Sequence, residues 1–217
     1  YLPTVVTVVS TVPAPFTLPS YTITAQSCTT NPANLAVTVF GQSNGGTASP
    51  ATQTICDLAA VANISIAGQR GNIVGWEKSV NGGAFAVDVS LGTANPISPS
   101  VPLVGGVQTV YKFHAIVQNG PCVTALSTDA TVTVNPIPPQ PTITPSGPTT
   151  FCIGGSVTLS SRNVIASSYQ WFKNGVAVVG ATSQTLLLNA IAQNGTYTVQ
   201  TFGVAPSNCA SPVSAGV

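Results

Sequence analysis

Apolar and polar residues alternate along much of this chain with a period of two. The alternation is clearest at 37–39, 64–66, 131–134, 157–159 and 197–199, where Val, Ile, Leu or Tyr is separated by Thr or Ser. A period of two places successive side chains on opposite faces of an extended strand, whereas a helix repeats every 3.6 residues. The pattern therefore predicts half-buried β-strands.

The segments between these strands are rich in turn formers and poor in helix formers. The chain of 217 residues has 18 prolines and 20 glycines, and few of its residues are Glu, Lys or Arg. Many short strands separated by turn residues are typical of a β-sandwich. We predict an all-β fold.

One long pattern occurs twice in the same order, which indicates internal repeats. It consists of a cysteine, a tryptophan about 20 residues later, an Asn-Gly pair, a strand led by tyrosine, and a second cysteine. The copies are Cys56, Trp76, Asn81–Gly82, Tyr111 and Cys122, then Cys152, Trp171, Asn174–Gly175, Tyr197 and Cys209. Asn-Gly supplies the positive φ angles of a type I′ hairpin turn. Because the tryptophans occupy matched positions, we expect both in a sandwich core rather than stacked on a sugar.

The first 40 residues carry only the later part of this pattern. A strand led by Tyr21 runs to Cys28, and residues 34–40 match the strand at 129–134. We therefore expect a window from a longer array. Its predicted parts are the C-terminal half of a preceding domain (1–42), a complete domain (43–135), a Pro-rich linker (136–141) and a domain lacking the end of its last strand (142–217). Consecutive prolines predict an extended, semi-rigid linker.

Charged side chains make up only 4% of the chain, against about 25% in typical soluble domains. The formal net charge of +1 gives no electrostatic footprint for nucleic acid or anionic lipid. No apolar run approaches the roughly 20 residues of a membrane-spanning helix. We expect no nucleic-acid partner and no membrane insertion, and a surface made soluble by hydroxyls and amides.

The residues that acid–base or metal chemistry requires are scarce. The single histidine, His114, is expected on the solvent side of its strand, and the four acids Asp57, Glu77, Asp88 and Asp129 are expected on the surface. Glu77 and Asp88 could face each other across the first hairpin, as two-carboxylate hydrolysis requires. A Ser-His-Asp triad needs a carboxylate that orients the base, and a calcium site needs several carboxylates. We predict no enzymatic activity, no cofactor and no metal.

Four further aromatic residues are less constrained by the pattern. Phe85, Tyr169, Phe172 and Phe202 have no matched partner in both repeats. Some of them could form an exposed patch, which is where a glycan or protein ligand would bind.

Three segments of the second repeat resemble an immunoglobulin domain. Residues 154–159, 169–172 and 194–199 resemble its strands B and C and its E–F corner, with Trp171 as the core plug and Tyr197 as the tyrosine corner. One departure is that the usual cysteine pair between strands B and F is missing. Leu159 and Val199 fall near those positions, so apolar packing is expected to replace the buried disulfide.

More narrowly, residues 53–56, 117–122 and 132–138 resemble the Ig-like repeats of large Bacteroidetes surface proteins. Those are adhesins and gliding-motility proteins exported by type IX secretion. The resemblance implies tandem immunoglobulin-like β-sandwich domains in an extracellular adhesin or stalk, secreted or attached to the outer membrane, whose partners are neighbouring repeats. The alternatives are a module that binds a glycan or surface protein, and an accessory domain of a secreted enzyme.

Five cysteines in a secreted chain leave at least one without a partner in the window. Pairing within domains would join Cys56 to Cys122 and Cys152 to Cys209. Immunoglobulin topology places those cysteines at opposite ends of a sandwich, roughly 20 Å or more apart, whereas a disulfide needs Cα atoms within about 7 Å. The other pairing joins Cys56 to Cys209 between successive domains and is slightly preferred. Cys28 would have its partner outside the window.

Overall fold

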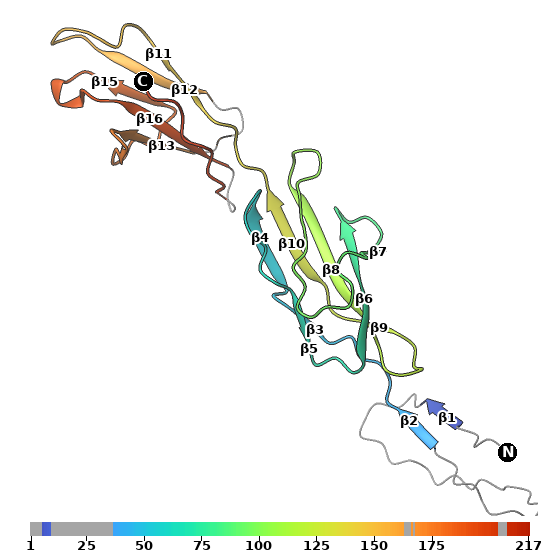
Figure 1. Cartoon of the computed structure of the whole chain (residues 1–217). Helices are drawn as coiled ribbons and strands as arrows, with labels where there is room; N and C mark the ends of the chain where they lie inside the picture. Colours follow the sequence, from blue (N-terminus) through green and yellow to red (C-terminus); the bar gives the residue numbers. More distant parts are fainter. Residues whose placement is uncertain (1–5, 10–36, 163–165, 167, 204–207) are drawn as a thin grey trace, which may run out of the picture. The chain divides into compact units, whose positions relative to one another are not determined.

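The computed structural model describes residues 6–9, 37–162, 166, 168–203 and 208–217. Apart from one short 3-10 helix, Ile191–Gln193, the regular elements in these residues are strands (Figure 1). The strands are β1 (Val6–Val9), β2 (Val37–Phe40), β3 (Thr47–Ser49), β4 (Thr52–Cys56), β5 (Ser65–Ala67), β6 (Asn72–Val80), β7 (Ala86–Val87), β8 (Thr109–Gln118), β9 (Ala125–Leu126), β10 (Ala130–Asn135), β11 (Thr142–Pro145), β12 (Val157–Arg162), β13 (Ser168–Lys173), β14 (Val176–Ala177), β15 (Thr185–Leu188) and β16 (Tyr197–Phe202).

The first sandwich has one large and one small sheet. The large sheet has the order β4-β10-β8-β6-β7, with β9 also paired to β8, and the small sheet pairs β3 with β5. The amide of Thr131 donates to the carbonyl of Ala51, and that of Asp57 to the carbonyl of Asn135. Residue numbers rise together along these contacts, so β4 and β10 run parallel.

The second sandwich is built from two three-stranded sheets. One has the order β11-β12-β15 and the other β14-β13-β16. Its core holds Trp171, Leu159 and Val199 together with Val157, Leu188 and Tyr197. Leu159 and Val199 therefore pack by apolar contact, as expected for a sandwich without the usual cysteine pair.

Local turn and core geometry follow the repeated pattern. Both residues of each Asn-Gly pair have positive φ, at 50° and 75° in the first repeat and 48° and 79° in the second, which confirms both hairpin turns. The Tyr197 hydroxyl donates to the Gln193 carbonyl four residues upstream (2.6 Å), which is the bond of a tyrosine corner. With this bond and the strand orders above, both sandwiches are immunoglobulin-like.

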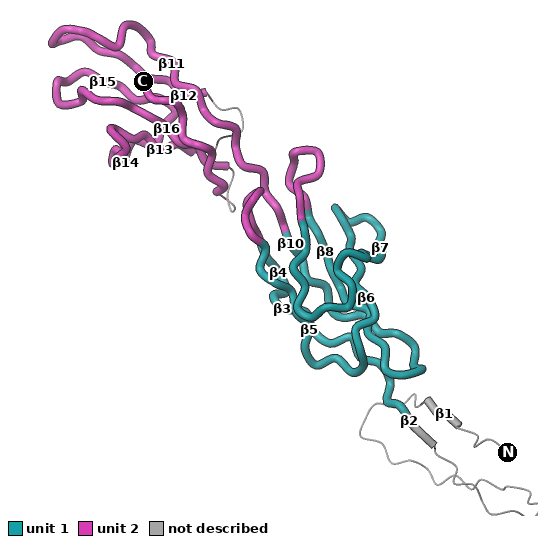
Figure 2. Tube along the Cα trace, viewed as in Figure 1, with its two compact units in different colours: residues 1–53, 61–100, 110–132 teal, residues 54–60, 101–109, 133–217 magenta. Residues whose placement is uncertain are grey.

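By its contacts the chain divides into two compact units (Figure 2). One comprises residues 1–53, 61–100 and 110–132, and the other comprises residues 54–60, 101–109 and 133–217. The division differs from the boundaries expected from sequence, because the end of β4 and the loop before β8 belong to the second unit. Of the expected half-domain at 1–42, the structure describes β1 and β2, which pair in parallel. The same arrangement joins β4 to β10.

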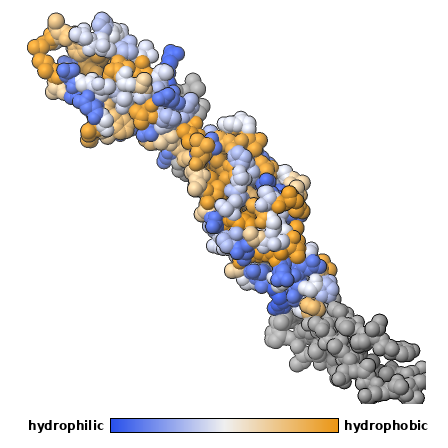
Figure 3. Space-filling view, viewed as in Figure 1, coloured by the Kyte–Doolittle hydropathy of each residue, from blue (hydrophilic) through white to orange (hydrophobic). Residues whose placement is uncertain are grey.

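Apolar residues are interspersed with polar ones on the visible face of each unit (Figure 3). Large apolar side chains that are largely exposed include Leu58, Val89, Val123, Ile153 and Val179. Single exposed apolar residues are normal on a protein surface, whereas contiguous patches mark interaction sites.

Candidate functional site

The structure joins Cys56, the last residue of β4, to Cys209, which follows β16, in a disulfide. Their Cα atoms lie 5.6 Å apart and the two residues are separated by 153 positions in sequence. Both belong to the second compact unit. The pairing within domains is not formed, because Cys122 and Cys152 are free thiols. Cys28 lies outside the described residues.

Strand geometry explains why Cys56 does not meet Cys122. Cys56 ends β4 beside Asn135, and the Gln108 side chain, just before β8, donates to the Asn135 side-chain oxygen (2.7 Å). Cys56 is thus near the start of β8, while Cys122 lies beyond its end. Ten strand residues span roughly 33 Å, far more than a disulfide can bridge.

Asn135 is the polar centre of the region around the disulfide. Its carbonyl accepts the amide of Asp57 (2.8 Å), and the Cys209 sulfur lies 3.9 Å from the same oxygen. Asn135 and Cys209 are both buried, and so is Pro138 in the linker. The sequence predicted a linker stiffened by its prolines. In the structure, Pro138 of this linker is buried.

A cysteine sulfur also lies next to a backbone carbonyl at Cys122, in the first unit. The Cys122 thiol donates to the carbonyl of Gly41 (3.3 Å), and the Asn119 side chain donates to the same oxygen (2.7 Å). Gly41 follows β2 directly, as Asn135 ends β10. Cys122 follows β8 and Cys209 follows β16. Each thus lies beside a carbonyl at or just after the last strand of the preceding repeat, β2 for Cys122 and β10 for Cys209. The match between residues 34–40 and 129–134 places the two carbonyls at equivalent points of successive repeats.

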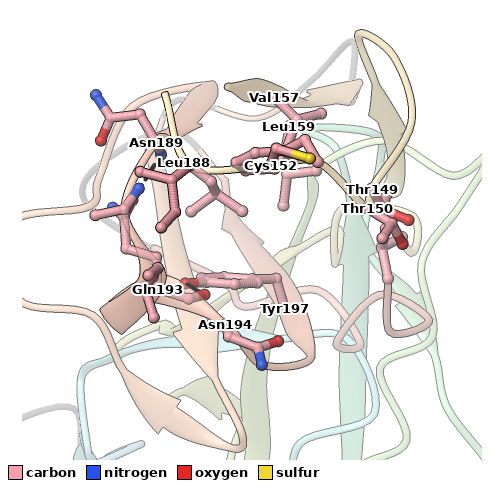
Figure 4. Close-up of a pocket in the computed structure, with 16 residues that line it drawn as sticks. Thr149, Thr150, Cys152, Val157, Leu159, Leu188, Asn189, Gln193, Asn194 and Tyr197 are labelled. Carbon is pink, nitrogen blue, oxygen red and sulfur yellow. Dashed lines mark hydrogen bonds between the residues drawn. The ribbon is translucent and has the colours of Figure 1, made fainter. Parts of the chain in front are cut away.

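Cys152 is exposed and lies at a cavity of about 640 Å³ (Figure 4). Gln193 and Tyr197 line the same cavity, as do the core residues Val157 and Leu159. Burial raises the pKa of the Tyr197 hydroxyl, and burial likewise raises that of Tyr111. The four residues expected in the cores, Trp76, Tyr111, Trp171 and Tyr197, are all buried.

His114 is buried between two carboxylates, so its predicted exposure is wrong. It lies opposite Glu77 in the β6–β8 register, with Nε2 2.7 Å from Glu77 Oε2 and Nδ1 3.1 Å from Asp129 Oδ1. The Phe85 ring stacks on the imidazole at a centroid distance of 4.0 Å, and only 5% of His114 is exposed. The carboxylates and Phe85 cover the ring.

The contacts of His114 connect β8, which carries it, to β6 through Glu77 and to the residue before β10, Asp129. They do not present the imidazole as a catalytic base. A triad histidine needs one ring nitrogen facing its nucleophile, but both nitrogens of His114 face carboxylate oxygens. Glu77 and Asp88 do not face each other as a catalytic pair, because Asp88 contacts Lys78 (2.7 Å) instead. Hydrogen bonds from Lys78 and then Ser90 lower the pKa of Asp88.

We expect His114→Ala to lower the free energy of unfolding of the first sandwich by about 1.5–3 kcal/mol, the range for hydrogen bonds to charged groups. The substitution leaves Glu77 and Asp129 without their shared partner. Chemical denaturation followed by circular dichroism measures the change. Val123→Ala, at a residue 85% exposed, is the control and should change stability by less than about 0.5 kcal/mol. An unchanged stability in His114→Ala would contradict the structural role. A hydrolytic activity that this substitution abolishes would favour an enzyme.

The four remaining aromatic residues do not form the exposed patch considered from sequence. Phe85 covers His114, and Tyr169 packs against the core of the second sandwich. Phe172 and Phe202 are half-buried. Within the described part of the chain, no group of three His, Cys, Asp or Glu residues could hold a metal ion.

Part of the chain matches a family model. Residues 44–136 match a domain of unknown function, DUF8696. This segment is almost the same as the complete domain that the sequence predicts at 43–135. Among curated proteins, none matches the chain.

Several solved structures are similar to the chain at low identity. The fibronectin(III)-like modules of Clostridium thermocellum CbhA are 16% identical, with a TM-score of 0.40 and coverage of 78% of this chain and 89% of theirs. The FN1–FN3 domains of chicken CNTN1 are 13% identical (TM-score 0.38; 82% and 65% covered). The human OSCAR ligand-binding domain is 16% identical (TM-score 0.36; 78% and 94% covered). The immunoglobulin-like assignment rests on strand order and the tyrosine corner, not on these scores.

None of the helices in the described residues has the length and apolar character needed to cross a membrane.

Proposed function

We propose that this chain is a non-enzymatic structural segment of a long extracellular adhesin or stalk, built of repeats that disulfides fasten to one another. The Cys56–Cys209 disulfide is the observation that carries the proposal. It joins the first repeat, at the end of β4, to the second repeat, beyond β16. Disulfides persist in oxidising compartments, which supports an extracellular location.

The position of the disulfide defines a covalent path for force. When the two ends of the chain are pulled apart, tension passes along the backbone to Cys56, through the sulfur–sulfur bond to Cys209, and on along the backbone beyond it. The segment between the two cysteines, which are 153 positions apart, holds β5 to β16. Tension that crosses the disulfide is therefore not carried by these strands. A protein that spaces a distal tip from a cell surface benefits from such a path, because its domains stay folded under load.

The histidine cluster and the aromatic residues bear on the alternatives. Both nitrogens of His114 face carboxylates, which favours a structural segment over an enzyme. The half-burial of Phe172 and Phe202 removes the clearest stacking surface for a glycan-binding module. An accessory domain of a secreted enzyme would be supported by a catalytic domain elsewhere in the same polypeptide. Export by type IX secretion and an origin in Bacteroidetes rest on the motifs at 53–56, 117–122 and 132–138 alone.

Mapping of peptides under non-reducing conditions tests the proposal. Trypsin leaves Cys28 and Cys56 on one peptide, because the first cationic residue is Arg70. A second cleavage by chymotrypsin after Phe40 separates these two cysteines. We expect a linked pair of peptides containing Cys56 and Cys209 that separates on reduction. A Cys56–Cys122 or Cys152–Cys209 pair would contradict the proposal.

A further inference from the structure

The two residues of the Cys56–Cys209 disulfide differ in their access to solvent. Cys56 ends β4 and is half-buried, whereas only 1% of Cys209 is exposed. A disulfide is reduced when a thiolate attacks one of its two sulfurs, and access decides which sulfur is attacked. An incoming thiol therefore reaches Cys56 first, and the sulfur of Cys209 is the leaving group.

The segment around Cys209 is held by backbone bonds that do not involve its sulfur. The Cys209 carbonyl accepts the amide of Gly203 (2.9 Å), and the amide of Ser211 donates to the carbonyl of Thr201 (2.8 Å). The Ser211 hydroxyl in turn accepts the amide of Thr201 (3.0 Å). None of these bonds needs the sulfur–sulfur bond, so the strand pairing by itself holds the Cys209 side chain in place.

Asn135 and the two residues that contact its carbonyl, Asp57 and Cys209, form what we call the Asn135 junction. The amide of Asp57 donates to this carbonyl (2.8 Å), and the Cys209 sulfur lies 3.9 Å from it. The linker that follows Asn135 has a polar anchor of its own, because the Gln140 side chain donates to the carbonyl of Val213 (2.7 Å). Both sides of the junction are thus fixed by hydrogen bonds as well as by the disulfide.

Cys122 shows how a free thiol is held beside such a carbonyl. Its S–H donates to the carbonyl of Gly41 (3.3 Å), and only 2% of the residue is exposed. The Asn119 side chain donates to the same oxygen (2.7 Å), and the Asn119 amide donates to the Ser43 hydroxyl (3.0 Å). A thiol is a weak hydrogen-bond donor, so the polar contacts around it supply most of the hold. Cys122 therefore shows a buried, hydrogen-bonded thiol where Cys209 has a disulfide.

We propose that the Asn135 junction is a redox-sensitive device with two closed states, one joined by the disulfide and one held by hydrogen bonds. A thiol compound attacks the Cys56 sulfur and forms a mixed disulfide there. The Cys209 sulfur leaves with the electron pair of the broken bond and takes up a proton. A second thiol attacks the mixed disulfide, which releases the reductant as its own disulfide and leaves a thiol on Cys56. The new Cys209 thiol donates to the Asn135 carbonyl, as Cys122 donates to Gly41.

The two states differ in the load that they carry. The device rests on the proposed function, in which the disulfide is the covalent path for force. Reduction removes that path and leaves the hydrogen bonds of the Asn135 junction in place. A thiol reductant in the surroundings therefore lowers the strength of the segment under tension without opening the junction at rest.

Alkylation of the reduced, folded chain tests the device. The oxidised chain is first mapped without reduction, which scores the disulfide itself. It is then reduced with dithiothreitol under native conditions and treated with iodoacetamide for increasing times. Trypsin followed by chymotrypsin places the cysteines on different peptides, since cleavage after Leu126 separates Cys122 from Cys152. Mass spectrometry gives each alkylation rate, with buried Cys122 and exposed Cys152 as internal references.

We expect Cys209 to react as slowly as Cys122, at least about tenfold more slowly than Cys152, because a closed junction must open locally before the thiol reacts. Cys56 should react faster than Cys209. Cys56→Ser provides the same Cys209 thiol without any reductant, and its Cys209 should be protected to the same degree. If Cys209 reacts as fast as Cys152 in both samples, the junction opens without the disulfide and the proposal is overturned.

The order of attack has a separate readout. Brief treatment of the oxidised chain with glutathione, stopped with acid, should leave glutathione on Cys56, and glutathione on Cys209 would overturn the proposed step. A chain that lacks the Cys56–Cys209 disulfide in the first mapping contradicts the proposed function and the device together. Rapid alkylation of Cys209 in a chain that had the disulfide contradicts the device alone.

Discussion

Replacing Trp76 or Trp171 by alanine will lower the free energy of unfolding of the sandwich that holds it by about 3–5 kcal/mol, the range for truncation of a buried tryptophan. Both side chains are completely buried. Each indole N–H donates to a backbone carbonyl, that of Ala94 (3.0 Å) for Trp76 and that of Ser183 (2.9 Å) for Trp171. Alanine therefore leaves both a cavity and an unpaired carbonyl.

Thermal melting followed by circular dichroism or calorimetry measures the effect. At about 4–8 °C per kcal/mol for domains of this size, the melting temperature of the altered sandwich should fall by more than about 10 °C. Each variant retains the other tryptophan, whose fluorescence reports on the unaltered sandwich. Val179→Ala, at a fully exposed side chain, is the control and should stay within about 0.5 kcal/mol of the parent. If melting is unchanged while binding of a ligand is lost, the tryptophans stack on a ligand instead.

The parts of the fold that could be predicted from sequence are those that local pattern determines. Asn-Gly pairs fix hairpin turns through backbone conformation alone. The matched tryptophans mark the core because the same position in two repeats must satisfy the same packing. The hydroxyl bond of Tyr197 reaches only four residues upstream, so it too depends on a short segment.

The burial of His114 could not be predicted from the alternation of apolar and polar residues along its strand. In β8 the residues Phe113, His114 and Ala115 are buried in succession, because one face packs in the core and the other is covered by side chains. That cover comes from Glu77 on the neighbouring strand and from Phe85. Recognising it requires the register between β6 and β8, which a single strand's pattern does not contain. Once Trp76 is paired with Ala115, Glu77 falls opposite His114.

The hydrogen bonds that serine hydroxyls accept from neighbouring strands were not predicted from sequence either. Ser127, Ser211 and Ser214 each accept an amide hydrogen bond from the preceding long strand through the side-chain oxygen. Serine is common in turns and on surfaces, so its presence gives no distinct signal in a chain rich in hydroxyl residues. The cavity beside Cys152 was not predicted either, since it depends on how two distant segments flank Tyr197.

Forced extension of single molecules held at their two ends tests most directly whether the disulfide carries load past the sandwiches. In the oxidised chain, the disulfide closes the residues between Cys56 and Cys209, 153 positions apart, into a loop. These residues therefore cannot add to the extended length. Reduction releases those residues. At about 3.3–3.6 Å for each residue, 153 residues add roughly 500–550 Å.

We expect oxidised molecules to show no unfolding steps from the segment between Cys56 and Cys209, which holds β5 to β16, and reduced molecules to show those steps and the added length. Cys209→Ser should behave like the reduced chain under oxidising conditions, whereas Cys152→Ser should behave like the oxidised parent. Equal extended lengths for oxidised and reduced chains would contradict the proposed load-bearing disulfide.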